Sequence, residues 1–212
     1  GTIVPFAPEL AFIPFPLTDV GVRFFGNEND QQLGLDGNIS DAGDINGDGV
    51  DDFMFSDPNN SDYGRTESGS TYVVFGGTGP DSIIDSASGN FGRYNISNFT
   101  ASSDEECLVI HGSAAGDRSG ASIAAVGDMN GDGVDDLAIG SPDGETFGDP
   151  DEAGRVDIIF GGSAPNSAID QSDSFGLPNS FDLNQNDEDT GIKTAGRFMG
   201  DHVGTSLSAA GD

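Results

Sequence analysis

The sequence predicts an all-β fold built from repeated antiparallel sheets. A unit of about 84 residues recurs, and the apolar runs are short and bounded by Gly, Asp and Pro. No segment sustains a helical period over three turns. The composition agrees, because 33 glycines and 34% hydrophobic residues suit short elements joined by tight turns better than a helical bundle.

The repeat is clearest in an acidic ten-residue motif. GDINGDGVDD at residues 43–52 returns as GDMNGDGVDD at residues 127–136, with nine of ten residues identical. The segment that leads into the second copy, residues 117–128, also matches residues 201–212 at the same shift of 84. The chain is therefore predicted to hold two units and the beginning of a third.

Strands are expected around each acidic motif. In the second unit a Ser/Ala/apolar run precedes the motif, residues 137–139 follow it, and residues 156–160 form a further run. A four-stranded sheet fits within each unit, and the Ser/Asn/Asp-rich stretches 77–107 and 162–193 are expected to be surface loops or an added hairpin. The predicted organisation is an extended apolar arm at 1–21, a first repeat at 22–108, a second at 109–192 and the start of a third at 193–212.

The arm differs from the rest of the chain. Its four prolines exclude a helix and favour extended or polyproline geometry. Three phenylalanines and the absence of basic residues indicate that it packs in a hydrophobic groove. Two outcomes are open: the arm folds back on its own chain, or it packs on a neighbouring molecule or adds a strand to it.

The two acidic motifs are candidate Ca²⁺ loops. Positions are counted from the first aspartate of each motif, Asp44 or Asp128. Each loop carries side-chain oxygens at positions 1, 3, 5 and 9, a carbonyl at position 7 and a turn-forming Gly at position 6, with no His or Cys nearby. The donors of the first loop are Asp44, Asn46, Asp48, the Val50 carbonyl and Asp52. Those of the second are Asp128, Asn130, Asp132, the Val134 carbonyl and Asp136.

Two other interpretations of these loops compete with a calcium site. An EF-hand needs a bidentate Glu at position 12 and flanking helices, but Phe55 and Ile139 stand there inside strand-like runs. A turn held by Asp and Asn side chains without metal is the other alternative. It is disfavoured because several converging carboxylates repel one another without a cation.

The motif order resembles the FG-GAP repeat of integrin alpha-subunit β-propellers and related bacterial surface proteins. The resemblance rests on the acidic motif, on Leu137-Ala138-Ile139-Gly140-Ser141-Pro142 and on Ile159-Phe160-Gly161-Gly162. It covers roughly residues 22–77, 109–162 and 197–212, and the first unit departs from it at residues 55–58. It implies antiparallel blades with calcium loops and an extracellular or cell-surface setting, but not catalysis.

Two blades and the start of a third form only an incomplete propeller. Open blades leave exposed strand edges and a half-covered core. We therefore expect other copies of the chain as partners, as in a filament with head-to-tail contacts, and a structural role in cell adhesion. The alternatives are an FG-GAP fragment of a secreted hydrolase and a ligand-binding integrin-like propeller.

Composition narrows the remaining functions. A formal net charge of −30 disfavours binding to nucleic acid or to anionic membranes, and no apolar run is long enough for membrane insertion. An enzyme is not expected, since His111 and His202 hold different repeat positions and no Gly-x-Ser-x-Gly motif is present. Four sequons could make the chain a glycoprotein that carries glycans at Asn38, Asn59, Asn95 and Asn98.

Overall fold

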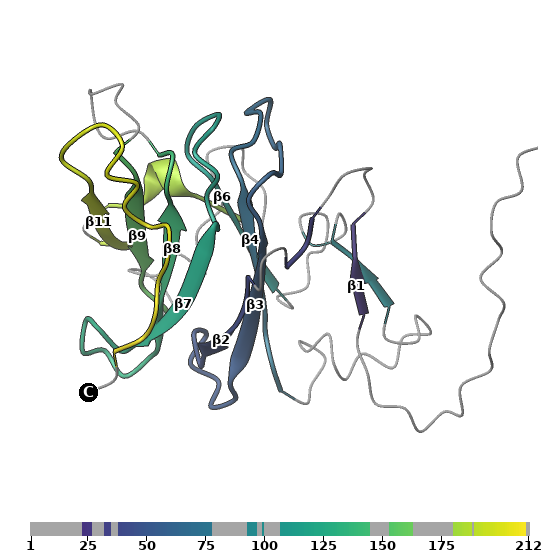
Figure 1. Cartoon of the computed structure of the whole chain (residues 1–212). Helices are drawn as coiled ribbons and strands as arrows, with labels where there is room; N and C mark the ends of the chain where they lie inside the picture. The colour runs from purple at the N-terminus through teal and green to yellow at the C-terminus, as the bar shows by residue number, and fades with distance from the viewer. Residues whose placement is uncertain are drawn as a thin grey trace, which may run out of the picture.

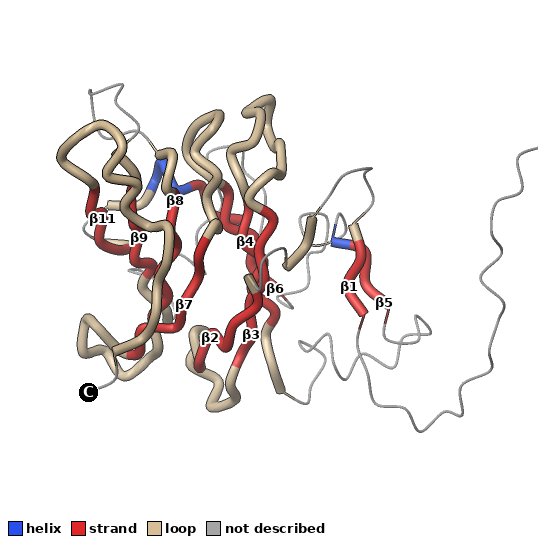
Figure 2. The backbone as a smooth tube through the Cα atoms, in the orientation of Figure 1, coloured by secondary structure: helices blue, strands red, loops and turns tan. Residues whose placement is uncertain are grey.

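The computed structural model describes residues 23–26, 32–34, 38–77, 93–96, 99, 107–144, 153–162, 180–187 and 189–210. The strands form two larger sheets and a two-stranded ribbon (Figures 1 and 2). The first sheet, in spatial order, contains β10 (Ser180–Asp182), β6 (Cys107–His111), β4 (Ser70–Val74), β3 (Asp52–Asp57) and β2 (Ile39–Gly43). The second contains β11 (Gly191–Ala195), β9 (Arg155–Ile159), β8 (Asp136–Ser141) and β7 (Ser122–Gly127). The ribbon pairs β1 (Arg23–Phe25) with β5 (Arg93–Asn95).

The four strands of the second sheet repeat β2, β3, β4 and β6 of the first, and β10 is an additional fifth strand of the first sheet. β3 and β8 start 84 residues apart, as do β6 and β11, whereas β4 and β9 start 85 apart. Each first strand carries a bulge at the same place, between Asp41 and Gly43 in β2 and between Ala125 and Gly127 in β7. The all-β class and the antiparallel sheets predicted from the sequence are confirmed. Two short pairings, β1 with β5 and β10 with β6, are parallel.

The main core lies between the two sheets. Alternation along the strands places Met54, Val73 and Leu108 on the face of the first sheet that meets Leu137 and Ile159 of the second. All five side chains are at most 1% exposed. Packing of one sheet on the other is therefore the main source of stability between the repeats.

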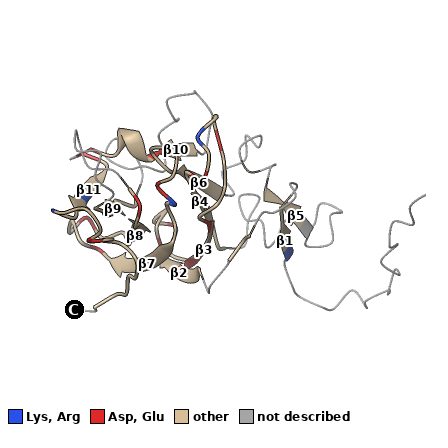
Figure 3. Ribbon diagram, turned by 45° about the horizontal axis from the view of Figure 1, so that its top comes forward, with Lys and Arg blue, Asp and Glu red and all other residues tan. Residues whose placement is uncertain are grey.

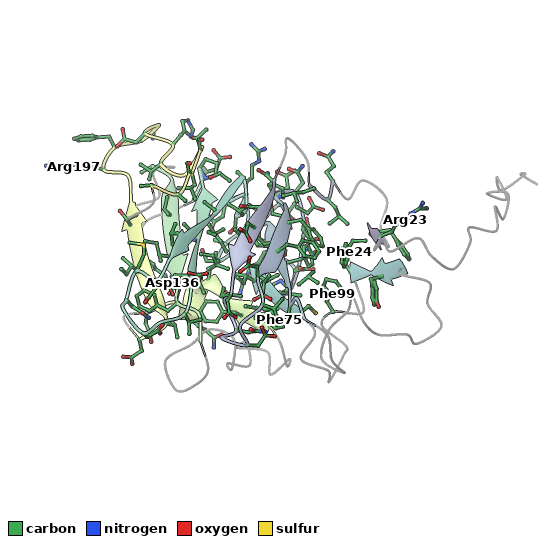
Figure 4. The ribbon with its side chains drawn as sticks, turned by 90° about the horizontal axis from the view of Figure 1, so that it is seen from below. Arg23, Phe24, Phe75, Phe99, Asp136 and Arg197 are labelled. Atoms are coloured by element: carbon green, nitrogen blue, oxygen red, sulfur yellow. The ribbon has the colours of Figure 1, made fainter. Side chains whose placement is uncertain are left out.

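The opposite face of the first sheet is also covered. Phe55 and Tyr72 point to that side, with ring centroids 5.3 Å apart, and Phe24 of β1 packs on Phe55 at 5.2 Å. Phe24 also meets Phe99 edge to face at 6.0 Å, and the ribbon lies on the side away from the second sheet (Figures 1 and 4). The first sheet is thus buried on both faces.

Several details go beyond the sequence expectations. β6 crosses the predicted boundary between residues 108 and 109, and it completes the first sheet. The stretch 162–193 contributes β10, a strand that joins the first sheet rather than the second. The arm at residues 1–21 lies outside the described residues. In the described part of the chain, no helix has the length and apolar character required to cross a membrane.

Candidate metal loops at the sheet junction

The two acidic motifs form matching loops that connect β2 to β3 and β7 to β8. Position 6 is Gly49 in the first loop and Gly133 in the second, with φ of 90° and 92°. An added Cβ would meet nothing within 4 Å at either glycine, so the requirement is the left-handed backbone and not space. The expected turn at position 6 is therefore present in both loops.

The first loop is closed by its own side chains. Asp44 accepts hydrogen bonds from the backbone N–H groups of Asp48 and Gly49, both at 2.9 Å. Asn46 Oδ1 accepts from the Asp48 N–H at 3.0 Å, and Asp48 Oδ1 accepts from the Val50 N–H at 2.8 Å. The side chains at positions 1, 3 and 5 are thus gathered over one short turn.

The second loop repeats this network. Asp128 accepts from the N–H groups of Asp132 and Gly133 at 3.0 and 2.9 Å, and also from Gly131 at 2.7 Å. Asn130 Oδ1 accepts from the Asp132 N–H at 2.9 Å, and Asp132 Oδ1 accepts from the Val134 N–H at 2.9 Å. Two loops with one geometry indicate that the motif sequence determines the local structure.

The aspartates at position 9 are buried and tie each loop to its sheet. Asp52 accepts from the N–H groups of Ile45 and Gly76 at 3.1 and 2.7 Å, and it is 2% exposed. Asp136 accepts from Met129 and Gly161 at 2.8 and 2.9 Å and is fully buried. Burial raises the pKa of Asp52 to about 6, against the hydrogen bonds that lower it. Burial likewise raises the pKa of Asp136.

The donor chemistry of the loops fits a hard cation. All donors are oxygens, and in each loop the negative charge of the position-5 aspartate raises the pKa of the position-9 aspartate. Within the residues that the structure describes, no three side chains of His, Cys, Asp or Glu gather closely enough to hold a metal alone. Calcium would therefore draw on the Asn side chain at position 3 and the carbonyl at position 7 as well. It would supply positive charge to the carboxylates.

The two loops meet at the junction of the sheets. Asp135 Oδ2 accepts a hydrogen bond from the Asp44 N–H at 3.0 Å, and the Asp135 N–H donates to the Asp44 carbonyl at 3.3 Å. The Gly162 N–H donates to the Ile45 carbonyl at 2.7 Å. Asp135 was not among the predicted site residues. Its repetition at position 8 of the motif, as Asp51 and Asp135, was the signal that could have identified it.

Three of the four predicted glycosylation positions lie in the described residues. Asn38, Asn59 and Asn95 are half-buried, and the Asn59 Nδ2 donates to Gln32 Oε1 at 3.1 Å. Asn98 lies outside the described residues. Acidic residues are distributed over both sheets and their loops, and the basic residues lie at separate places along the ribbon (Figure 3).

Comparison with known families identifies one of the two units. No curated protein matches the chain. A family model described as the FG-GAP repeat matches residues 119–159, which run from three residues before β7 through the second acidic loop and β8 to the end of β9. The first acidic loop lies outside the match, and its relation to the second rests on the internal repeat and on the shared geometry. The chain thus contains an FG-GAP repeat at residues 119–159.

Proposed function

We propose that the chain is a calcium-stabilised structural or adhesive repeat protein that acts outside the cell and stacks with further copies of itself. The observation that carries the proposal is the contact between the acidic loops at the sheet junction. Asp44 is a candidate metal ligand of the first loop, and its backbone N–H and carbonyl are hydrogen-bonded to Asp135 of the second loop. A cation that orders one loop would therefore also order the contact with the next repeat. Calcium modules of weak affinity suit the high calcium level outside cells.

The second sheet supports the stacking part of the proposal. Its outer strand exposes Ile192, which is 45% exposed, whereas Leu108 at the equivalent position of the first sheet is 1% exposed in the core. The segment that follows β11 is hydrogen-bonded to the second repeat in the same way as the segment that follows β6 is hydrogen-bonded to the first. Val203 N–H donates to the Ala153 carbonyl at 3.1 Å, just as Ser119 N–H donates to Ser68 at 2.9 Å. A further repeat from another copy would cover Ile192.

We also propose that the described residues serve no catalytic role. His111 has the best-placed polar neighbours: its Nδ1 lies 3.0 Å from Asp62 Oδ2 and 3.4 Å from Ser70 Oγ. In a catalytic triad the serine and the carboxylate bond opposite ring nitrogens, whereas here both face Nδ1. Burial raises the pKa of Asp62, but the hydrogen bond and charge of His111, together with hydrogen bonds from Ser70 and Asn60, keep that pKa below its ordinary value. This pair supports a structural role.

Assembly in calcium tests the proposed function. Sedimentation and electron microscopy of the chain with calcium are expected to show oligomers or fibres that dissociate in EDTA. Ile192→Lys should shift the chain to monomers, because it places a charge in the apolar contact. Ile39→Lys is the matched control, since Ile39 is 65% exposed on a strand of the first sheet. A monomer in calcium at every concentration would reject the stacking part of the proposal.

A further inference from the structure

A short segment of the second repeat lies in the first sheet. β10 comes after β9 and before β11 in the chain, yet it pairs with β6, with Ser180 opposite Val109 and Asp182 opposite His111. The first repeat mirrors this arrangement, because β1 starts 84 residues before β6 and pairs in parallel with β5, with Phe25 opposite Asn95 as Val109 is opposite Ser180. The pairing therefore recurs, and in the second repeat it places β10 in the sheet that packs on β9 and β8. Residues 180–186 are called the latch segment below.

The latch segment is packed into the core between the sheets. Phe181 and Leu183 are both fully buried, and they belong to the same apolar cluster as Ile110 of the first sheet and Ile159 of the second. The latch segment therefore shares one core with side chains of both sheets. In the chain it belongs to the second repeat, but in space it belongs to the first sheet. Removing it from that core would expose apolar surface on both sides.

Polar contacts fasten the latch segment to the first sheet. The Arg65 guanidinium, from the loop between β3 and β4, grips Asp182 with two hydrogen bonds of 3.1 and 2.6 Å. Asp182 is fully buried, and hydrogen bonds to it raise the pKa of Arg65 above its ordinary value. Asn184 Nδ2 donates to the Ser113 carbonyl at 2.8 Å, just after β6. The bidentate Arg65–Asp182 pair and the Asn184 hydrogen bond thus hold the latch segment to the first sheet.

The same segment is bonded to the second sheet. Asn186 Nδ2 donates to Asp157 Oδ1 of β9 at 3.1 Å, and Arg155 Nε donates to Asp157 Oδ2 at 2.6 Å. Arg155 also reaches across to Ser113 Oγ at 2.7 Å. The network is continuous from the first sheet through the latch segment to the second, and its carboxylates at 157 and 182 are fully buried. Buried networks of this kind act as a unit.

The latch segment lies at the edge of the first sheet opposite β2. The sheets approach each other directly through β2 and β7, with β3 and β8 beside them. β10 lies at the other edge of the first sheet, across β6, β4 and β3 from β2. Apolar side chains of the two sheets pack between these edges, and the latch segment adds buried polar contacts at the edge away from β2 and β7. We infer that residues 180–186 form a latch that fixes the second sheet on the first and makes the two unfold as one cooperative unit.

Calorimetry of an Arg65→Met variant tests the latch. The variant leaves Asp182 buried without its bidentate partner, which is strongly destabilising. The unaltered chain is expected to unfold in one transition. The variant should show two transitions, and the midpoint of the earlier one should lie on the order of 10 °C below the single transition of the unaltered chain. Arg118→Met is the control, because Arg118 pairs with Asp143 at 3.6 Å on the surface. A single transition in the Arg65 variant, at whatever temperature, would overturn the inference.

Hydrogen exchange of the unaltered chain gives a test that needs no variant. If the latch couples the sheets, the amides of β6 and β9 share one opening reaction and exchange at rates that agree within about tenfold after correction for intrinsic rates. Amides of β10 should join the same group. Exchange of β10 and β9 through separate openings, with β6 protected more than tenfold longer, would contradict the latch.

Discussion

A Gly69→Ala variant is expected to lose about 3 kcal/mol or more of unfolding free energy, although it adds only one methyl group. Gly69 has φ of 81°, where an L-residue pays about 1–2 kcal/mol. Its Cβ would overlap the backbone carbonyl of Ser119, which cannot rotate away. Four backbone hydrogen bonds join residues 66–69 to residues 112–119. Relief would break at least the two nearest Gly69, from the Ser119 N–H to the Ser68 carbonyl and from the Gly112 N–H to the Gly69 carbonyl, each worth about 1 kcal/mol.

Gly64→Ala provides the matched control on the same loop. Gly64 has φ of 77°, but a Cβ there would meet nothing within 4 Å. It should therefore show the backbone cost alone, about 1–2 kcal/mol. Urea unfolding of both variants measures the difference. Equal losses at positions 64 and 69 would show that the close approach of Gly69 to Ser119 does not stabilise the fold.

Calcium removal is expected to produce the second large effect. At about 100 times its dissociation constant, an ion bound to one loop adds about 2.7 kcal/mol, so two loops give about 5 kcal/mol. For a chain of this length that corresponds to a melting temperature higher by roughly 10–20 °C. The physical cause is that calcium would offset the cost of charging the loop carboxylates, since burial, and to a smaller extent the charge of Asp48, raise the pKa of Asp52 to about 6. Scanning calorimetry in calcium and in EDTA measures the shift.

Two controls separate loop binding from general screening of the acidic surface. Asp48→Ala removes a donor that is exposed and accepts only local hydrogen bonds, and should lose about half of the calcium-dependent gain. Asp189→Ala removes an equally exposed carboxylate outside the loops and should retain the whole gain. If both variants lose the same amount, calcium acts through screening of the net charge of −30 and not through the loops.

The strands of the repeat could be predicted because their signals are local. The apolar run at 137–139 lies within β8, and the similar run at 156–160 overlaps β9. The loop conformation was predictable for the same reason, since glycines at position 6 and short polar side chains at positions 1, 3 and 5 determine the turn within ten residues. Because the motif is repeated, the same strands and the same loop are predicted in both units, and the two units have equivalent structures.

The elements that the sequence did not reveal depend on distant partners. β10 is three residues long and polar at both ends, and only its pairing with β6 and the burial of Phe181 define it. β5 similarly depends on β1, about 70 residues away. The role of Asp135 was hidden because its partner, the Asp44 N–H, belongs to the preceding repeat. Local patterns do not report which residues meet across two repeats.

Calcium titration by calorimetry tests the central claim most directly, that the two acidic loops are calcium sites which stabilise the stacked repeats. The unaltered chain is predicted to bind two calcium ions saturably. Asp48→Ala should bind one, and Asp48→Ala combined with Asp132→Ala should bind none, while both variants keep the β-sheet circular dichroism spectrum. Absence of saturable binding in the unaltered chain, or two remaining sites in the double variant, would contradict the claim.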